Sequence, residues 1–157
     1  MEESEFISKK IVIYYYSYHT MSTKKLLEGI VKNFSNISLI PVTPEVQIDL
    51  ENYDYIGFAS GIYYMNFGKP IYDLLKRTEN LQGKPCFILS TSGGLKERYK
   101  YCIKDLIEKQ GGKFLDGFNC FGFDCIFPIN LFGGMNKGKP DEEDIKNAKD
   151  FLKATIK

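Results

Sequence analysis

The chain has 157 residues, the length of one domain of ordinary size, and 43% of them are hydrophobic, which excludes a globally disordered protein. Its 21 lysine and arginine residues nearly balance its 20 aspartate and glutamate residues, so no strong overall field attracts nucleic acid or an anionic membrane. No segment approaches the roughly 20 apolar residues of a membrane span, and the acidic N-terminal segment does not have the composition of a signal peptide.

Apolar runs alternate with amphipathic stretches along the chain. Runs rich in β-branched and aromatic residues predict five strands, at residues 10–16, 37–42, 53–60, 85–91 and 113–123. Apolar residues at helical spacing predict helices over residues 22–33, 70–77, 97–109 and 141–157, and a short helix can be accommodated between Thr43 and Asn52. This alternation predicts one α/β domain over residues 1–157, a doubly wound parallel sheet with helices on both faces.

Two further features of the sequence allow predictions. Residues 124–139 form a long segment with glycine and proline but no periodicity, and loops of that length in compact domains are often functional. The four cysteines are Cys86, Cys102, Cys120 and Cys125, and none of them makes a CxxC pair or has a histidine nearby. We expect four free thiols in a reducing compartment, and no metal site. Cys120 and Cys125 are close in sequence, so a redox pair of these two is the alternative.

The residues after the first predicted strand are candidates for anion binding, because ligands of open parallel sheets bind at the carboxyl ends of the strands. Hydroxyl groups are available from Ser17, Thr20, Ser22 and Thr23, and the free N–H groups at the start of the following helix favour a phosphate monoester. The same residues can instead simply cap the helix. The segment contains neither a P-loop nor a GxGxxG fingerprint. His19, the only histidine, lies in this loop and is a candidate phosphate contact rather than a catalytic base.

The loops after the third and fourth predicted strands suit a flat ring. Tyr63 and Tyr64 can stack on such a ring or can pack against a neighbouring helix. Gly93 and Gly94 let the backbone approach a planar ligand closely, or form a plain turn.

At these loops the sequence resembles the flavodoxin family. The resemblance rests on KIVIYYYSYHTMSTKKLLEGI, YDYIGFASGIYY, FILSTSGG and GFNCFGFD…GGMNKGKPDEEDIKNAKDFL, and it spans essentially the whole chain. It implies a five-stranded flavodoxin-like sheet in the order 2-1-3-4-5, noncovalently bound FMN and electron transfer. By this resemblance the FMN phosphate would contact Ser17, His19, Thr20, Met21, Ser22 and Thr23. One side of the isoalloxazine would contact Gly61, Ile62, Tyr63, Tyr64, Met65 and Asn66, and the other side Thr91, Ser92, Gly93 and Gly94.

The sequence departs from the family pattern at three positions. Met21 and Ser22 stand where relatives usually carry Gly and Asn, and Met65 stands where they often carry Gly. A non-glycine residue at positive φ is strained, which leaves open a flavodoxin-like scaffold that has lost FMN. The enzyme alternative is an NAD(P)H-dependent flavin or quinone reductase, so whether the chain is an enzyme stays open. Expected partners are a redox protein or a small electron donor or acceptor, for a monomer or homodimer in the cytoplasm.

Overall fold

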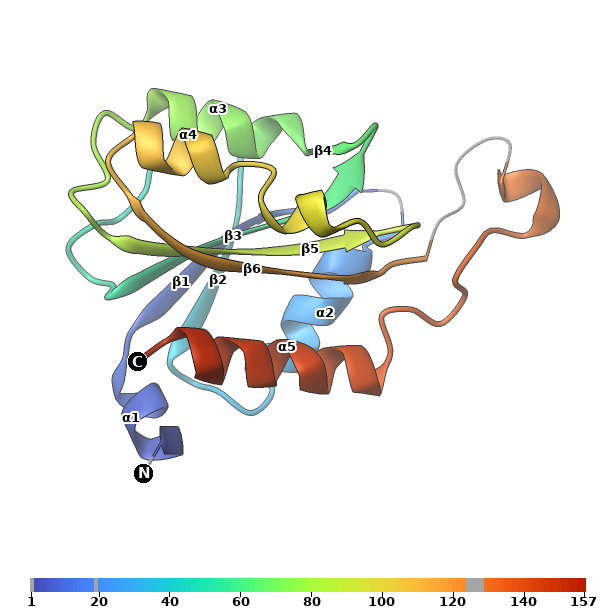
Figure 1. The fold of residues 1–157 in the computed structure, drawn as a ribbon, viewed down its shortest axis with the longest axis horizontal. Helices are drawn as coiled ribbons and strands as arrows, with labels where there is room; N and C mark the ends of the chain where they lie inside the picture. The colour runs from blue at the N-terminus through green and yellow to red at the C-terminus, as the bar shows by residue number, and fades with distance from the viewer. Residues whose placement is uncertain (1, 19, 124–128) are drawn as a thin grey trace.

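Five parallel strands form the centre of the structure, a computed structural model that describes residues 2–18, 20–123 and 129–157 (Figure 1). These strands are β1 (Ile11–Tyr16), β2 (Ile37–Pro41), β3 (Tyr55–Tyr63), β5 (Pro85–Ser92) and β6 (Lys113–Phe121). Their order in the sheet is β2-β1-β3-β5-β6, which confirms the predicted topology. The two-residue strand β4 (Asn66–Phe67), which the sequence did not predict, pairs antiparallel with the end of β3.

Helices cover both faces of the sheet, as expected from right-handed crossovers (Figure 1). One face packs against α1 (Glu2–Ser8), α2 (Ser22–Val31) and α5 (Glu142–Thr155), and the other against α3 (Lys69–Arg77) and α4 (Lys104–Lys109). Alternate residues of β1 supply the two cores, since Ile11 and Ile13 belong to the first and Val12 and Tyr14 to the second. A strand buried on both faces explains the unbroken apolar run.

Three helical segments differ from the prediction. The helix expected over residues 97–109 is divided into η1 (Glu97–Lys100), a 3-10 turn, and α4. A further 3-10 turn, η2 (Ile129–Phe132), lies in the long segment before α5. The sequence pattern did not predict α1. In this helix Phe6 is buried against Phe34, with the ring centroids 5.0 Å apart.

The short helix considered between Thr43 and Asn52 is absent from this described segment. Apart from one turn, in which the Val46 N–H donates to the Thr43 carbonyl at 3.1 Å, backbone groups of this segment bond to side chains. The Asp49 N–H donates to the Tyr14 hydroxyl at 2.8 Å, and the Asp49 carboxylate accepts from the N–H groups of Glu51 and Asn52. Such local side-chain bonds compete with helix formation.

Candidate functional site

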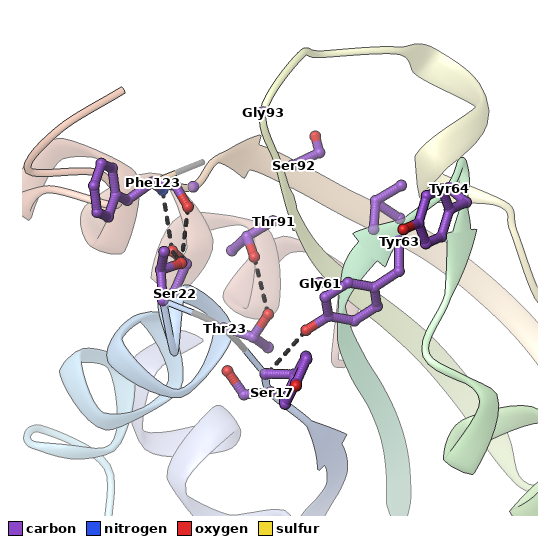
Figure 2. A pocket seen from close by; sticks show the side chains of 14 residues that line it. Ser17, Ser22, Thr23, Gly61, Tyr63, Tyr64, Thr91, Ser92, Gly93 and Phe123 are labelled. Atoms are coloured by element: carbon purple, nitrogen blue, oxygen red, sulfur yellow. Dashed lines mark hydrogen bonds between the residues drawn. The ribbon is translucent and has the colours of Figure 1, made fainter. Parts of the chain in front are cut away.

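A pocket opens at the carboxyl edge of the sheet, where the loops after β1, β3 and β5 meet (Figure 2). The space inside it, open solvent at its mouth included, is about 610 Å³. Predicted residues that line it are Ser17, Thr20, Ser22, Thr23, Gly61, Ile62, Tyr63, Tyr64, Thr91, Ser92 and Gly93. The structure therefore brings all three predicted loops to one site.

Five of the predicted site residues are not among the residues that line the pocket. Met21, Met65, Asn66 and Gly94 belong to the same loops but do not line the pocket, and His19 lies outside the described residues. Three lining residues were missed: Tyr18, Gly122 and Phe123. The last two follow β6 and reach the first loop only through the folded sheet, where an added Cβ at Gly122 would lie 3.0 Å from Cβ of Ser22. No local pattern in the sequence signals that approach.

The start of α2 presents open backbone donors to the pocket. Met21 is the N-cap residue, with φ 57°, and makes no capping hydrogen bond through its side chain. The N–H of Lys24 donates to the Ser17 hydroxyl at 3.2 Å. The N–H groups of Ser22 and Thr23 have no hydrogen-bond partner among the described residues. Open N–H groups in a first helical turn, with the helix dipole behind them, favour an anion.

Two hydroxyl groups in the first loop are already committed to other bonds. Thr20 donates its single hydroxyl proton to the Phe123 carbonyl at 2.8 Å, so in the 2.8 Å bond between Thr20 and Ser22 it is Ser22 that donates. The Ser22 hydroxyl also accepts from the Phe123 N–H at 3.0 Å. These bonds tie the loop to the segment after β6 (Figure 2). Both residues therefore fix the loop rather than offer protons to a ligand.

Ser17 and Thr23, the other two residues of the first loop with hydroxyl groups, differ from this pair. Thr23 and Thr91 are buried and share a hydrogen bond of 2.9 Å, which joins the first loop to the end of β5. The Ser17 hydroxyl accepts the Lys24 N–H, and its own proton has no partner among the described residues. Ser17 is thus the side-chain hydroxyl best placed to donate to an anion here.

The β3–β4 hairpin forms a second wall of the pocket. Its two-residue turn places Tyr64 at φ 50° and Met65 at φ 73°, in the left-handed region that favours glycine or asparagine. The positive φ anticipated for Met65 is thus present, and Asn66 does not take it instead, since it pairs with Tyr63 in the sheet. Tyr64 is 94% exposed at the tip.

Tyr63 links this hairpin to the first loop. Its hydroxyl accepts the Tyr18 N–H at 2.9 Å, and burial raises the pKa of Tyr63 to about 12. Figure 2 shows the Tyr63 ring alongside Gly61, where an added Cβ would lie 2.7 Å from the hydroxyl oxygen. Glycine at position 61 is therefore required by the present position of Tyr63.

Hydrogen bonds of three side chains fix the loop after β5 and the end of that strand. The Ser92 hydroxyl donates to the Gly94 carbonyl at 2.8 Å, and the Asn136 amide donates to the carbonyl of Gly93 at 2.7 Å. Asn119 donates to the Ser90 hydroxyl at 2.8 Å. These bonds hold the backbone of Gly93 at the pocket wall.

The pocket lining restricts the chemistry that the chain itself can perform. Among the described lining residues no side chain is a carboxylate, histidine, lysine or thiol. The described chain also holds no cluster of potential metal ligands and no helix able to span a membrane. Cys86, Cys102 and Cys120 are free thiols, whereas Cys125 lies outside the described residues. Burial raises the pKa of Cys86 and that of Cys120 to about 12, which keeps both unreactive.

Comparisons with known proteins identify a family, a relative and similar folds. A family model described as a flavodoxin domain matches residues 12–126. An uncharacterised protein of Methanocaldococcus jannaschii is 36% identical over 94% of this chain and 99% of its own length. Oxidised flavodoxin 2 of Bacillus cereus has a similar structure, with a TM-score of 0.64 and 18% identity over 93% of this chain and 97% of its own. A Lactobacillus acidophilus flavoprotein in complex with FMN has a TM-score of 0.57 and 20% identity, covering 73% of this chain and 93% of its own.

Proposed function

This chain belongs to the flavodoxin family, and from that premise we propose that it binds FMN noncovalently in the pocket at the carboxyl edge and uses it to transfer electrons. The structurally similar Lactobacillus acidophilus flavoprotein was solved in complex with FMN. The observation that carries the proposal is the start of α2. Two open N–H groups, those of Ser22 and Thr23, lie beside the available proton of Ser17 at the pocket. A phosphate monoester satisfies all three donors.

The residues of the pocket fit the two ends of FMN. The first loop, including His19, would contact the phosphate, with Thr20 and Ser22 fixing its shape. The isoalloxazine would lie between the β3–β4 hairpin and the Thr91–Gly94 loop, whose backbone is held in place by Ser92 and Asn136. Met21, Met65, Asn66 and Gly94 would support these loops from outside the lining.

The bound flavin would supply the electron-accepting and electron-donating chemistry. The chain would bind it, orient it and exclude water from the enclosed side of the pocket. Because the described lining holds no acid or base, proton movement would rely on hydroxyl groups, backbone groups and solvent at the open mouth. The three described free thiols fit the reducing conditions of the cytoplasm, where we place the protein.

The test is the visible spectrum of the purified protein, followed by chromatography of the flavin released by heat. We expect the absorption bands of oxidised flavin and release of FMN, since the site offers one phosphate pocket and no dinucleotide motif. Release of FAD from a well-occupied sample would contradict the assignment. A colourless protein that cannot be reconstituted with FMN would instead support a scaffold. Rapid oxidation of NADH by the holoprotein with a quinone would identify the reductase alternative.

A further inference from the structure

The pocket wall formed by the loop after β5 is made largely of backbone. Gly93 has no side chain, the Ser92 hydroxyl donates to the Gly94 carbonyl at 2.8 Å, and the Thr91 hydroxyl shares its hydrogen bond with Thr23. Recognition of a ring on this side therefore depends on how the peptide groups around Gly93 are oriented. A residue outside the lining that fixes their orientation would control the shape of the wall.

Asn136 makes such a contact from the segment that leads into α5 (Figure 1). Its side-chain amide donates to the Gly93 carbonyl at 2.7 Å and to the Gly122 carbonyl at 3.3 Å. The amide NH₂ has two hydrogens, so both bonds can form at once. Gly93 follows β5 and Gly122 follows β6, and both line the pocket, whereas Asn136 does not. One side chain outside the lining thus joins two loops of the wall.

The turn that carries Asn136 is itself attached to two helices. Asn136 lies at φ 60°, a left-handed conformation that asparagine tolerates better than most residues. The Lys139 N–H donates to the Asn136 carbonyl at 3.1 Å, and the ammonium group of Lys25 in α2 donates to the Gly138 carbonyl at 3.2 Å. The Lys139 ammonium pairs with Asp141, the N-cap residue of α5, at 2.8 Å. The amide of Asn136 is therefore held in position against the pocket wall.

We propose that Asn136 is a positioning residue for the flavin ring, and that binding of the ring in turn stabilises the turn 136–139; this inference rests on the proposed flavin-dependent function. Asn136 acts through the carbonyl groups of Gly93 and Gly122 and not on the flavin itself. Coupling between two sites is reciprocal. If the amide bonds favour the shape of the wall that binds the ring, the bound ring favours the amide bonds to the same extent.

The test uses Asn136→Gly, because glycine retains the left-handed backbone and removes only the side-chain amide. Gln82→Gly is the matched control. It also removes a side-chain amide from a residue at positive φ, here 55°, in the turn before β5 and so at the opposite end of that strand from the pocket. Asn136→Asp keeps the size of the side chain, but an ionised carboxylate cannot donate to the two carbonyl groups. Urea titration would establish that all three variants fold.

Fluorescence titration with FMN and with riboflavin, which has the ring but no phosphate, separates the two ends of the site. We expect Asn136→Gly to weaken binding of both flavins by the same factor, about threefold to tenfold. Asn136→Asp should weaken both at least as much, and Gln82→Gly neither. The ratio of the two affinities should therefore stay at its wild-type value. Unchanged affinities in Asn136→Gly, or a loss for FMN alone, would overturn the proposal.

Hydrogen exchange followed by NMR tests the reciprocal effect. The Lys139 N–H bonds to the Asn136 carbonyl and reports on the turn. FMN and riboflavin should each slow its exchange at least threefold in the wild-type protein, and this slowing should be lost in Asn136→Gly. Equal slowing in the two proteins would overturn the coupling.

The flavin-free protein separates this inference from the proposed function. The Gly122 N–H donates to the Ser92 carbonyl at 2.9 Å and reports on the wall that Asn136 joins. Its exchange should be faster in flavin-free Asn136→Gly than in the flavin-free wild type, and unchanged in Gln82→Gly. Failure of the wild type to bind either flavin would refute the proposed function, while faster exchange at Gly122 would still support the positioning role of Asn136. Unchanged exchange at Gly122 would refute that role even if FMN binds.

Discussion

The first loop and the β3–β4 turn lie at the same pocket but are stabilised in opposite ways. The first loop is fixed by side-chain hydrogen bonds to β5 and to Phe123, contributed by Thr20, Ser22 and Thr23. The turn has two consecutive non-glycine residues at positive φ and is exposed to solvent. The loop also has one residue at positive φ, Met21, but side-chain bonds hold the loop to the rest of the sheet, whereas the turn has two such residues at its exposed tip. We infer that the phosphate end of the site is rigid and that the flavin end adjusts.

The largest expected effect concerns the rigid loop. Ser17→Ala removes the one side-chain hydroxyl of this loop whose proton is available. The variant therefore loses a charge-assisted hydrogen bond to the phosphate, worth roughly 1.5–3 kcal/mol. FMN affinity, measured by quenching of flavin fluorescence, should fall about tenfold to hundredfold.

Thr20→Val is the matched comparison for Ser17→Ala. It should lower the free energy of unfolding by about 1 kcal/mol through the lost bond to Phe123, with a smaller loss of FMN affinity. The reverse order of the two affinities would show that Thr20, and not Ser17, donates to the phosphate.

A smaller effect is expected at the turn. Met65→Gly relieves a left-handed conformation that costs an L-residue roughly 1–2 kcal/mol, part of which is offset by the greater chain entropy of glycine. The free energy of unfolding, from urea titration, should rise by about 0.5–1 kcal/mol. FMN affinity should change less than in Ser17→Ala.

The control for this variant is Gln82→Gly, which has φ 55° in a turn far from the pocket. It should give a similar gain in stability and leave FMN affinity unchanged. If Met65→Gly destabilises the protein while Gln82→Gly does not, the turn depends on the methionine side chain and is not simply strained.

The smallest expected effect tests the link between the two loops. Burial raises the pKa of Tyr63 from 10.0 to about 12, so the stability that depends on its neutral hydroxyl is complete below pH 10 and is lost between pH 10 and about 12. Tyr63→Phe should remove part of this alkaline loss, as seen in urea midpoints at pH 8 and pH 11. Tyr14 contributes in the same direction and remains in the variant. Tyr64→Phe, which changes an exposed side chain, should leave the alkaline loss as in wild type.

The sequence predicted the sheet because strand periodicity and strand–helix alternation are local signals. It also predicted the three loops, because parallel strands bring their carboxyl ends together. It could not show that Gly122 and Phe123 complete the pocket, since their contact with Ser22 joins residues about a hundred positions apart. Nor could it show which hydroxyl groups of the first loop already donate to other protein groups, because those hydrogen bonds depend on the same contact.

The division between η1 and α4 was missed for the same reason, because it depends on a contact between segments that are separate in the sequence. An added Cβ at Gly117 of β6 would lie 2.0 Å from the Lys100 carbonyl oxygen, so the end of η1 rests directly on the sheet.

The most direct test of the phosphate site compares FMN with riboflavin, which has the same ring system and lacks the phosphate. Fluorescence titration of the flavin-free protein should show FMN binding at least tenfold more tightly than riboflavin, and Ser17→Ala should narrow that ratio. Equal affinities for the two flavins in the wild-type protein would contradict the assignment of the first loop to the phosphate.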